Sequence, residues 1–220
     1  MKYRFTKRTG GESHGAFASL NLGTHVGDDL ETVMKNRAIL AALTGPTQFM
    51  NQVHGDRIAL IEEVTDEIPT ADALVTGIPG ISLAVMVADC IPLLLSSEES
   101  VAAVHVGRKG LVNEVTRKSI SLMRDMGATK ISAHLGPSIC GSCYEVSEDI
   151  FREVIAVHPA AKSQTLGGTF ALDLPKALIE VLNDEGVQVI NEFACTVESQ
   201  DYFSYRRDGV TGRQAGVISL

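Results

Sequence analysis

Residues 81–106 read ISLAVMVADCIPLLLSSEESVAAVHV, three apolar segments in close succession. The first, Ile81–Val87, is almost wholly apolar, which is typical of a strand buried on both faces. After a break at Asp89-Cys90, we expect Ile91–Leu95 to continue that strand. The polar loop SSEES then leads into a further strand over Val101–Val106. The stretch therefore predicts a buried β-sheet at the centre of the protein.

Helices and shorter strands are predicted on both sides of this stretch. Asp28 or Asp29 can cap a helix that continues to about Leu43 and stops at Gly45-Pro46. Apolar spacing predicts further helices over residues 112–126, 147–157 and 174–185. The remaining strands are expected over residues 49–53, 58–61, 73–76, 131–135, 187–190, 193–197, 203–205 and 215–218. Strands outnumber helices, and hairpin-like neighbours occur beside helical crossovers, so we predict an α+β or mixed α/β fold and not a doubly wound parallel sheet.

The composition sets limits on organisation and partners. A chain of 220 residues without repeats or an evident linker is expected to form one domain over residues 1–220. The formal net charge of −8 argues against a broad surface for nucleic acid or anionic membranes. The N-terminal MKYRFTKRTGGESHG lacks the apolar core of a secretory signal, and no apolar run reaches the length of a membrane span. We therefore expect a cytoplasmic monomer that acts on small molecules.

Three residues at predicted strand ends could carry chemistry. His54 ends a strand in NQVHG, Cys90 follows the first apolar segment in ADCIP, and His105 lies near the end of the third in VHVG. Three such ligands with an open fourth position form the usual catalytic zinc site, and the same set could hold copper. Two alternatives remain: a buried cysteine with two hydrogen-bonded histidines, or a Cys90 nucleophile with His105 as its base.

A second group of polar residues could bind an anionic substrate. The C-terminal FSYRRDGVTGRQ brings Arg206, Arg207 and Arg213 close together in an otherwise acidic chain. Guanidinium groups suit phosphate or carboxylate, although the same arginines could instead form ion pairs that support the core. Further candidates for binding substrate or phosphate are Arg37, Lys109, Gln52 and Asn21.

The remaining cysteines form a less specific pattern. Cys140 and Cys143 form a C-x-x-C in CGSC, which by itself suggests a redox pair or half of a zinc knuckle. The chain has no second C-x-x-C, and no βαβ context surrounds this one. We therefore expect no site there, and we expect Cys195 to belong to the core.

The order of several short motifs resembles that of a known family. NQVHG, ADALVT, ADCIPLLL, VHVG, GPSI with CYEV, and FSYRRDG with TGR occur in this order. They are similar to the motifs of the YfiH-like family, also labelled laccase-domain, polyphenol oxidase or peptidoglycan editing factor. The resemblance begins near SLNLGTHVGDD and continues to the C-terminus. It implies a single sandwich of mixed β-sheets flanked by helices, with His54, Cys90 and His105 as the metal ligands.

The resemblance also implies an activity. The resemblance implies a purine nucleoside phosphorylase that depends on zinc, with copper as the alternative metal. Such an enzyme would cleave adenosine, inosine and methylthioadenosine, and it would also deaminate some adenosine. An amidase that edits peptidoglycan precursors with the same Cys/His site is one alternative, and a copper-dependent polyphenol oxidase is another. The chain has six histidines, and only two of them lie in matched motifs. These are too few ligands for a multi-copper centre.

One motif departs from the family pattern. The usual H-x-G-W-R-G becomes His105-Val-Gly-Arg108-Lys109-Gly in this chain. Arginine and lysine are not equivalent in bidentate contacts with anions. The three ligands are intact, so we expect the change to affect substrate preference more than the chemistry.

Overall fold

The apolar stretch of residues 81–106 forms three fully buried strands, β5 (Ser82–Val87), β6 (Ile91–Ser96) and β7 (Val101–Val106). The computed structural model describes residues 1–220. The expectation that β6 continues β5 is wrong, because the two strands lie in different sheets. The chain changes sheet at Asp89, whose φ of 94° lies in the left-handed region. This crossover places Cys90 at the end of the sandwich, where the two sheets meet.

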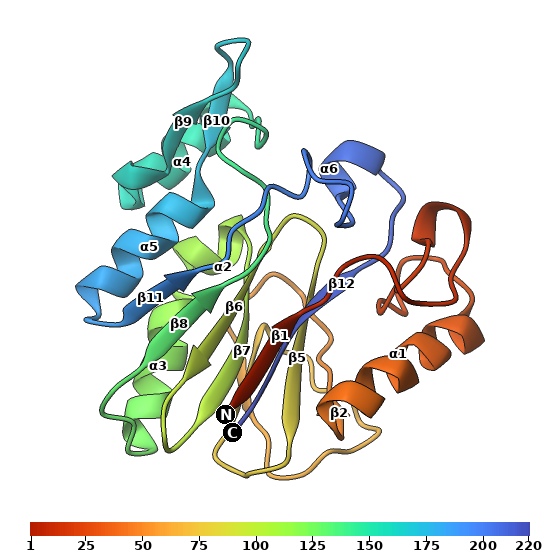
Figure 1. Ribbon diagram of the computed structural model, residues 1–220. Helices are drawn as coiled ribbons and strands as arrows, with labels where there is room; N and C mark the ends of the chain where they lie inside the picture. Colours follow the sequence, from red (N-terminus) through yellow and green to blue (C-terminus); the bar gives the residue numbers. More distant parts are fainter.

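A four-stranded sheet has the order β1-β12-β5-β2. Its other strands are β1 (Lys2–Phe5), β2 (Thr47–Gln48) and β12 (Gln214–Ser219). β12 pairs antiparallel with both β1 and β5, whereas β2 pairs parallel with β5. The pairing of β1 with β12 brings the two chain termini together (Figure 1).

A six-stranded sheet has the order β11-β8-β6-β7-β4-β3. Its other strands are β3 (Ile58–Leu60), β4 (Ala73–Thr76), β8 (Ser132–Leu135) and β11 (Gln188–Asn191). The four central strands pair antiparallel, and the outer pairs β3–β4 and β8–β11 are parallel. A separate antiparallel hairpin consists of β9 (Lys162–Gln164) and β10 (Phe170–Leu172).

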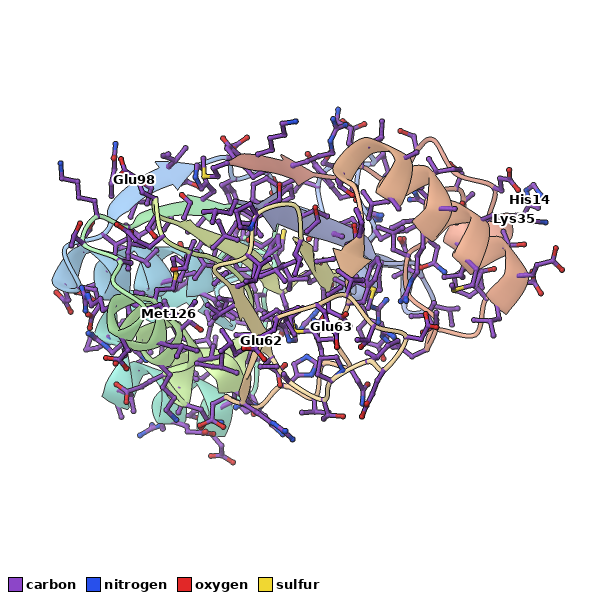
Figure 2. The ribbon with its side chains drawn as sticks, turned by 90° about the horizontal axis from the view of Figure 1, so that it is seen from below. His14, Lys35, Glu62, Glu63, Glu98 and Met126 are labelled. Carbon is purple, nitrogen blue, oxygen red and sulfur yellow. The ribbon has the colours of Figure 1, made fainter.

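The first five helices pack on the outer faces of the two sheets, whereas the sixth and shortest has no buried residue. The helices are α1 (Leu30–Thr44), α2 (Arg108–Val112), α3 (Val115–Asp125), α4 (Glu148–Val157), α5 (Leu174–Asp184) and α6 (Tyr205–Asp208), with 3-10 turns η1 (Gly15–Phe17) and η2 (Pro159–Ala161). Asp29, Ser147 and Asp173 cap α1, α4 and α5 by accepting a hydrogen bond from a first-turn N–H. Figure 2 shows α1, which carries the labelled Lys35, at one side of the molecule, and the labelled Met126, which follows α3, at the other. No helix has both the length and the apolar character needed to cross a membrane.

Three apolar clusters define the layers. The largest, with 26 buried residues, fills the space between the six-stranded sheet and helices α2 to α5. A second cluster of 12 lies between the two sheets, and a third of 8 lies between the four-stranded sheet and α1. Along β7, Ala102, Val104 and Val106 face the helices, while Val101 and Ala103 face the other sheet. Strand alternation therefore aims His105 into the space between the sheets.

The layered arrangement confirms the predicted mixed α+β fold, and some local predictions are corrected. Residues 49–53 form no strand beyond a single bridge at Asn51, and residues 193–197 form only a bridge at Cys195. Residues 203–205 lead into α6. The predicted helix over residues 112–126 is divided between α2 and α3, because Glu114 takes a left-handed φ of 62° that breaks the hydrogen-bonded ladder. Sequence patterning also missed β1 and the β9–β10 hairpin.

Candidate metal centre and substrate cavity

The side chains of His54, Cys90 and His105 meet at one end of the sandwich. Their three donor atoms all lie within 4.8 Å of one another. His54 Nε2 is 3.8 Å from Cys90 Sγ, and the two imidazole rings have centroids 4.6 Å apart. The three residues come from the segment before β3, the crossover between β5 and β6, and the end of β7. Tertiary structure thus unites donors that are far apart in sequence.

Two of the positions at this site have unusual backbone geometry. His54 has a φ of 58° and Asp89, next to Cys90, has a φ of 94°. Non-glycine residues in this region carry a strain of about 1 kcal/mol or more, which surrounding contacts must offset. His54 N donates to Asp72 Oδ1 at 2.9 Å, and the Asp89 carboxylate accepts from Thr196 Oγ1 at 2.6 Å. These contacts hold both ligand-bearing turns in place.

The Asp72 carboxylate supports two of the three donor residues through hydrogen bonds. The Asp72 side chain is fully buried just before β4 and accepts from His105 Nδ1 at 2.8 Å. The same carboxylate accepts the backbone N–H groups of Val53, His54 and Gly55 at 3.3, 2.9 and 2.6 Å. Sequence reasoning assigned no role to Asp72, although it lies within the ADALVT motif. A carboxylate behind a ligating histidine is a common support for a metal ligand.

Gly107 leaves room for the centre. A Cβ at this position would lie 3.0 Å from Cys90 Sγ and 3.2 Å from His54 Cδ2. The absence of a side chain therefore lets the α2 N-terminus approach the donors closely.

The donors influence one another's protonation. Burial raises the pKa of the Cys90 thiol, but the imidazoles of His105 and His54 outweigh this effect and lower it from 9.0 to about 6. Burial lowers the pKa of His105, but the Cys90 thiolate and Asp72 outweigh it and raise it from 6.5 to about 9. The site therefore favours a thiolate, the form of cysteine that binds metals and attacks electrophiles.

The donor set fits a zinc ion. Zn–S and Zn–N bonds of about 2.3 and 2.0–2.1 Å in a tetrahedron place sulfur and nitrogen about 3.6 Å apart. The separation of 3.8 Å between Cys90 Sγ and His54 Nε2 is close to that value. One thiolate and two imidazoles leave a fourth position open, as in catalytic zinc sites. The same donors also suit copper.

A cavity of about 610 Å³ opens onto these donors. Two arginines, Arg206 and Arg213, line the cavity together with the half-buried Tyr144 and exposed Tyr205. Arg206 donates to the carbonyl of Glu145 at 2.9 Å and lies 5.2 Å from the centre of the Tyr144 ring. The cavity therefore combines metal donors, cationic groups and aromatic surface, which suits a polar ligand with a flat ring.

Three of the predicted binding residues line this cavity: Arg206, Arg213 and Gln52. Gln52 pairs with the backbone of Met86, donating to its carbonyl at 2.7 Å and accepting from its N–H at 2.9 Å. Burial lowers the pKa of Arg213, whose guanidinium donates to the carbonyls of Thr211 and Gly212. Gln52 thus anchors the cavity wall, whereas the two arginines supply its positive charge.

The other predicted binding residues lie outside the cavity. Asn21 is buried and hydrogen-bonds within its own loop and to Arg213 N. Arg37 stacks on Phe49 with Cζ 3.9 Å from the ring centre and donates to the carbonyl of Leu22. Burial lowers the pKa of Arg37 to about 10. Asn21 therefore supports its own loop, and Arg37 packs α1 against Phe49.

Arg207 and Lys109 also lie outside the lining of this cavity. The Arg207 guanidinium donates to the carbonyls of Thr196, Val197, Ser199 and Tyr202 and pairs with Asp208, so it supports a loop. Lys109 is exposed on α2. Arg108 stands at the position of the usual tryptophan, and its Nη1 lies 3.7 Å from Glu153 Oε2 on α4.

The chain is similar over nearly its whole length to several known proteins. A family model described as "Multi-copper polyphenol oxidoreductase laccase" matches residues 2–220. A Corynebacterium glutamicum protein named purine nucleoside phosphorylase is 42% identical over 228 residues, covering 98% of this chain and 93% of its own. A Shigella flexneri protein named purine nucleoside phosphorylase YfiH is 35% identical over 222 residues, covering 97% and 91%. The crystal structure of a Neisseria meningitidis protein of the family model DUF152 has a TM-score of 0.92 at 39% identity, covering 100% and 93%.

Proposed function

The chain belongs to the family described as multi-copper polyphenol oxidoreductase laccase. Because the relatives from Corynebacterium glutamicum and Shigella flexneri are named purine nucleoside phosphorylase, we propose that this chain is a zinc-dependent purine nucleoside phosphorylase. Adenosine, inosine and methylthioadenosine are the proposed substrates. The observation that carries the proposal is the single cavity that joins the His54, Cys90 and His105 donors to Arg206 and Arg213.

Phosphorolysis needs an anion site beside the sugar. In this reaction a phosphate oxygen forms a bond to C1′ as the bond from C1′ to the purine nitrogen breaks. The electron pair of that bond stays on the purine, which takes up the phosphate proton. Arg206 and Arg213 would hold the phosphate and offset its charge, because guanidinium groups bind phosphate in a bidentate manner.

The remaining lining residues suit the nucleoside. Tyr144 and Tyr205 offer rings on which a purine can stack, and Val87 and Ile139 add apolar surface. His25 also lines the cavity, and burial followed by the charge of Arg213 lowers its pKa. His25 is therefore neutral near pH 7 and can accept a hydrogen bond from a sugar hydroxyl or from phosphate.

His54, Cys90 and His105 would hold the zinc ion, with Asp72 fixing the orientation of His105. Zinc supplies Lewis-acid chemistry at its open position. The chain's own contribution is to orient the substrate against that position and to exclude bulk water from a half-enclosed cavity. Hydrolytic deamination of adenosine, in which water replaces the amino group and ammonia leaves, is a second reaction that the same donors support.

Two other activities use the same residues. An amidase that edits peptidoglycan precursors would use Cys90 as the nucleophile, and the lowered pKa of that thiol supports this alternative. A multi-copper oxidase of phenols needs several histidine-rich copper sites. Only two of the six histidines, His54 and His105, belong to a donor cluster, which makes this alternative weaker.

The deciding experiment measures adenosine turnover with and without phosphate, for the wild-type chain and Cys90→Ala, with products separated by chromatography. We expect adenine and ribose 1-phosphate from the wild type only when phosphate is present, and no product from the variant. Treatment with a zinc chelator abolishes turnover, and added Zn²⁺ restores it.

Other outcomes favour the alternatives. Inosine formed regardless of phosphate would make the chain a deaminase. Release of an amino acid from a peptidoglycan precursor, without nucleoside turnover, would favour the amidase. Activity in Cys90→Ala equal to that of the wild type would overturn the assignment of this site.

A further inference from the structure

A second cluster of donor atoms lies apart from the cavity donors. Cys140, Cys143, Cys195 and Glu198 each offer one atom, and these atoms all lie within 4.8 Å of one another. Sequence spacing alone predicted no site at the C-x-x-C and assigned Cys195 to the core. Cys195 is indeed buried, but the structure places its thiol beside the other two. The partner of the C-x-x-C is therefore a cysteine more than fifty residues further along the chain.

Backbone pairing brings the two segments together. Ser138 and Cys195 form a parallel bridge, in which Ser138 N donates to the carbonyl of Ala194 and Thr196 N donates to that of Ser138, both at 3.1 Å. Two residues beyond Ser138 the chain makes a tight turn, with Cys143 N donating to the Cys140 carbonyl at 3.1 Å. The turn presents both thiols of the C-x-x-C toward the segment that carries Cys195.

The carboxylate completes the group. Glu198 Oε1 is 4.0 Å from Cys140 Sγ and 3.8 Å from Cys143 Sγ. In a tetrahedral zinc centre, sulfur and oxygen ligands lie about 3.5 Å apart, so a small contraction would bring these atoms to ligand positions. The guanidinium of Arg207 binds the carbonyls of Val197 and Ser199 on either side of Glu198, which holds that loop in its present course.

The chemistry of the donors identifies the ligand class. Thiolates are soft ligands that select zinc over magnesium or calcium, and three of them with one carboxylate occupy all four positions of a tetrahedron. A disulfide among three cysteines would leave one thiol over, whereas a metal ion would use all three. We propose that Cys140, Cys143, Cys195 and Glu198 bind a structural Zn²⁺ ion, separate from the ion at the cavity.

The two centres differ in the property that separates structural from catalytic zinc. The cavity site has three protein donors and an open position, whereas the second site has four protein donors and is closed. The assignment stands independently of the proposed phosphorylase activity, because it rests only on this donor cluster.

A metal ion at the second site would also stabilise the turn that carries Cys90. Asp89, next to Cys90, accepts from Thr196 Oγ1 at 2.6 Å, and its carbonyl accepts from Ile139 N at 2.9 Å. Thr196 follows Cys195, and Ile139 precedes Cys140. A metal ion that joins these cysteines would therefore hold together the two segments that support the Cys90 turn.

The first test counts metal ions in the full-length chain. Protein produced in zinc-supplemented medium and purified under reducing conditions is analysed by elemental mass spectrometry. We expect two zinc ions per chain in the wild type, one in Cys143→Ser, one in Cys90→Ala and none in the double variant. Glu192→Gln, which removes an exposed carboxylate outside the cluster, is the matched control and retains both ions.

The second test uses Co²⁺ as a spectroscopic probe in Cys90→Ala, where the cavity site has lost its thiolate. We expect thiolate-to-cobalt charge transfer and the visible bands of tetrahedral Co²⁺, and we expect both to disappear when Cys143→Ser is added. Glu198→Gln keeps the three thiolates, so it retains the charge-transfer band and binds Co²⁺ more weakly. Cys143 is partly exposed, which makes its serine variant a milder test of folding than Cys195→Ser.

Three results would overturn the proposal. They are an unchanged zinc content in a folded Cys143→Ser variant, a disulfide among the three cysteines in freshly purified protein, and iron in place of zinc in the Cys90→Ala chain. Since each readout is independent of turnover, failure of the phosphorylase proposal leaves this test intact.

Discussion

His105 Nδ1 lies 2.8 Å from the Asp72 carboxylate, and this contact determines which nitrogen of the imidazole faces the metal position. With Nδ1 engaged by Asp72, Nε2 is the nitrogen available as a ligand. The same carboxylate accepts three backbone N–H groups from the turn that carries His54. Asp72 therefore couples the orientation of one histidine ligand to the backbone of the other.

The first prediction concerns this coupling. Asp72→Asn keeps the shape of the side chain but removes its charge, so it weakens the support for both histidines. We expect zinc affinity at the cavity site to fall by about 10- to 100-fold. Competition with a chromophoric chelator measures the change. Asp66→Asn, an exposed substitution in the β3–β4 loop, should leave affinity unchanged, and equal affinity in both variants would contradict the role of Asp72.

The second prediction concerns Gly107. A Cβ 3.0 Å from Cys90 Sγ and 3.2 Å from His54 Cδ2 forces these donors apart, so Gly107→Ala should lose zinc at the cavity site and lose turnover. Elemental analysis and the adenosine assay check both effects. Gly167→Ala is the matched control, because its Cβ would meet only Thr165 Oγ1 at 3.7 Å. Full zinc content in Gly107→Ala would show that the centre tolerates a wider spacing.

The third prediction concerns the cavity arginines. Arg206→Ala and Arg213→Ala each remove a guanidinium from the proposed phosphate site, a loss of roughly 1.5–3 kcal/mol in binding. We expect KM for phosphate to rise by about 10-fold or more, with a smaller change in KM for the nucleoside. Initial rates at varied phosphate concentration measure this split. Arg4→Ala on β1 removes an exposed arginine far from the cavity and should leave both constants unchanged.

The fourth prediction concerns stability and pH. Arg124, followed by Arg117, holds the pKa of Glu185 below its ordinary value of 4.5, because both guanidinium groups favour the carboxylate. The stabilisation is present above the ordinary pKa and is lost as the pH falls through the lowered one. Glu185→Gln should therefore lower the free energy of unfolding by about 1 kcal/mol at pH 7. Urea unfolding at several pH values measures this difference.

The difference between Glu185→Gln and the wild type should shrink in acid, once the wild-type carboxyl is protonated. Glu63→Gln, exposed in the β3–β4 loop, provides the comparison and should change stability little at any pH. A difference that stayed constant down to the acid limit would mean that the ion pairs with Arg117 and Arg124 do not stabilise the fold.

Much of the architecture follows from local pattern. The apolar runs that became β5, β6 and β7, and the capped helices α1, α4 and α5, were evident because burial and hydrogen-bonding rules act over a few residues. The motifs NQVHG, ADCIP and VHVG also indicate His54, Cys90 and His105 as candidate ligands. By contrast, β9–β10 and the break at Glu114 depend on backbone conformations that apolar spacing does not encode.

The amino-acid sequence by itself determined the buried strands β5, β6 and β7, the capped helices α1, α4 and α5, and the identity of His54, Cys90 and His105 as candidate ligands. Only the tertiary structure decided that β5 and β6 belong to different sheets, that Asp72 supports the centre, and that Cys195 joins the C-x-x-C. The physical reason is the distance along the chain over which each kind of signal acts. Periodicity reports which face of a segment is buried, whereas sheet pairing and side-chain contacts join segments whose separation along the chain carries no local signal.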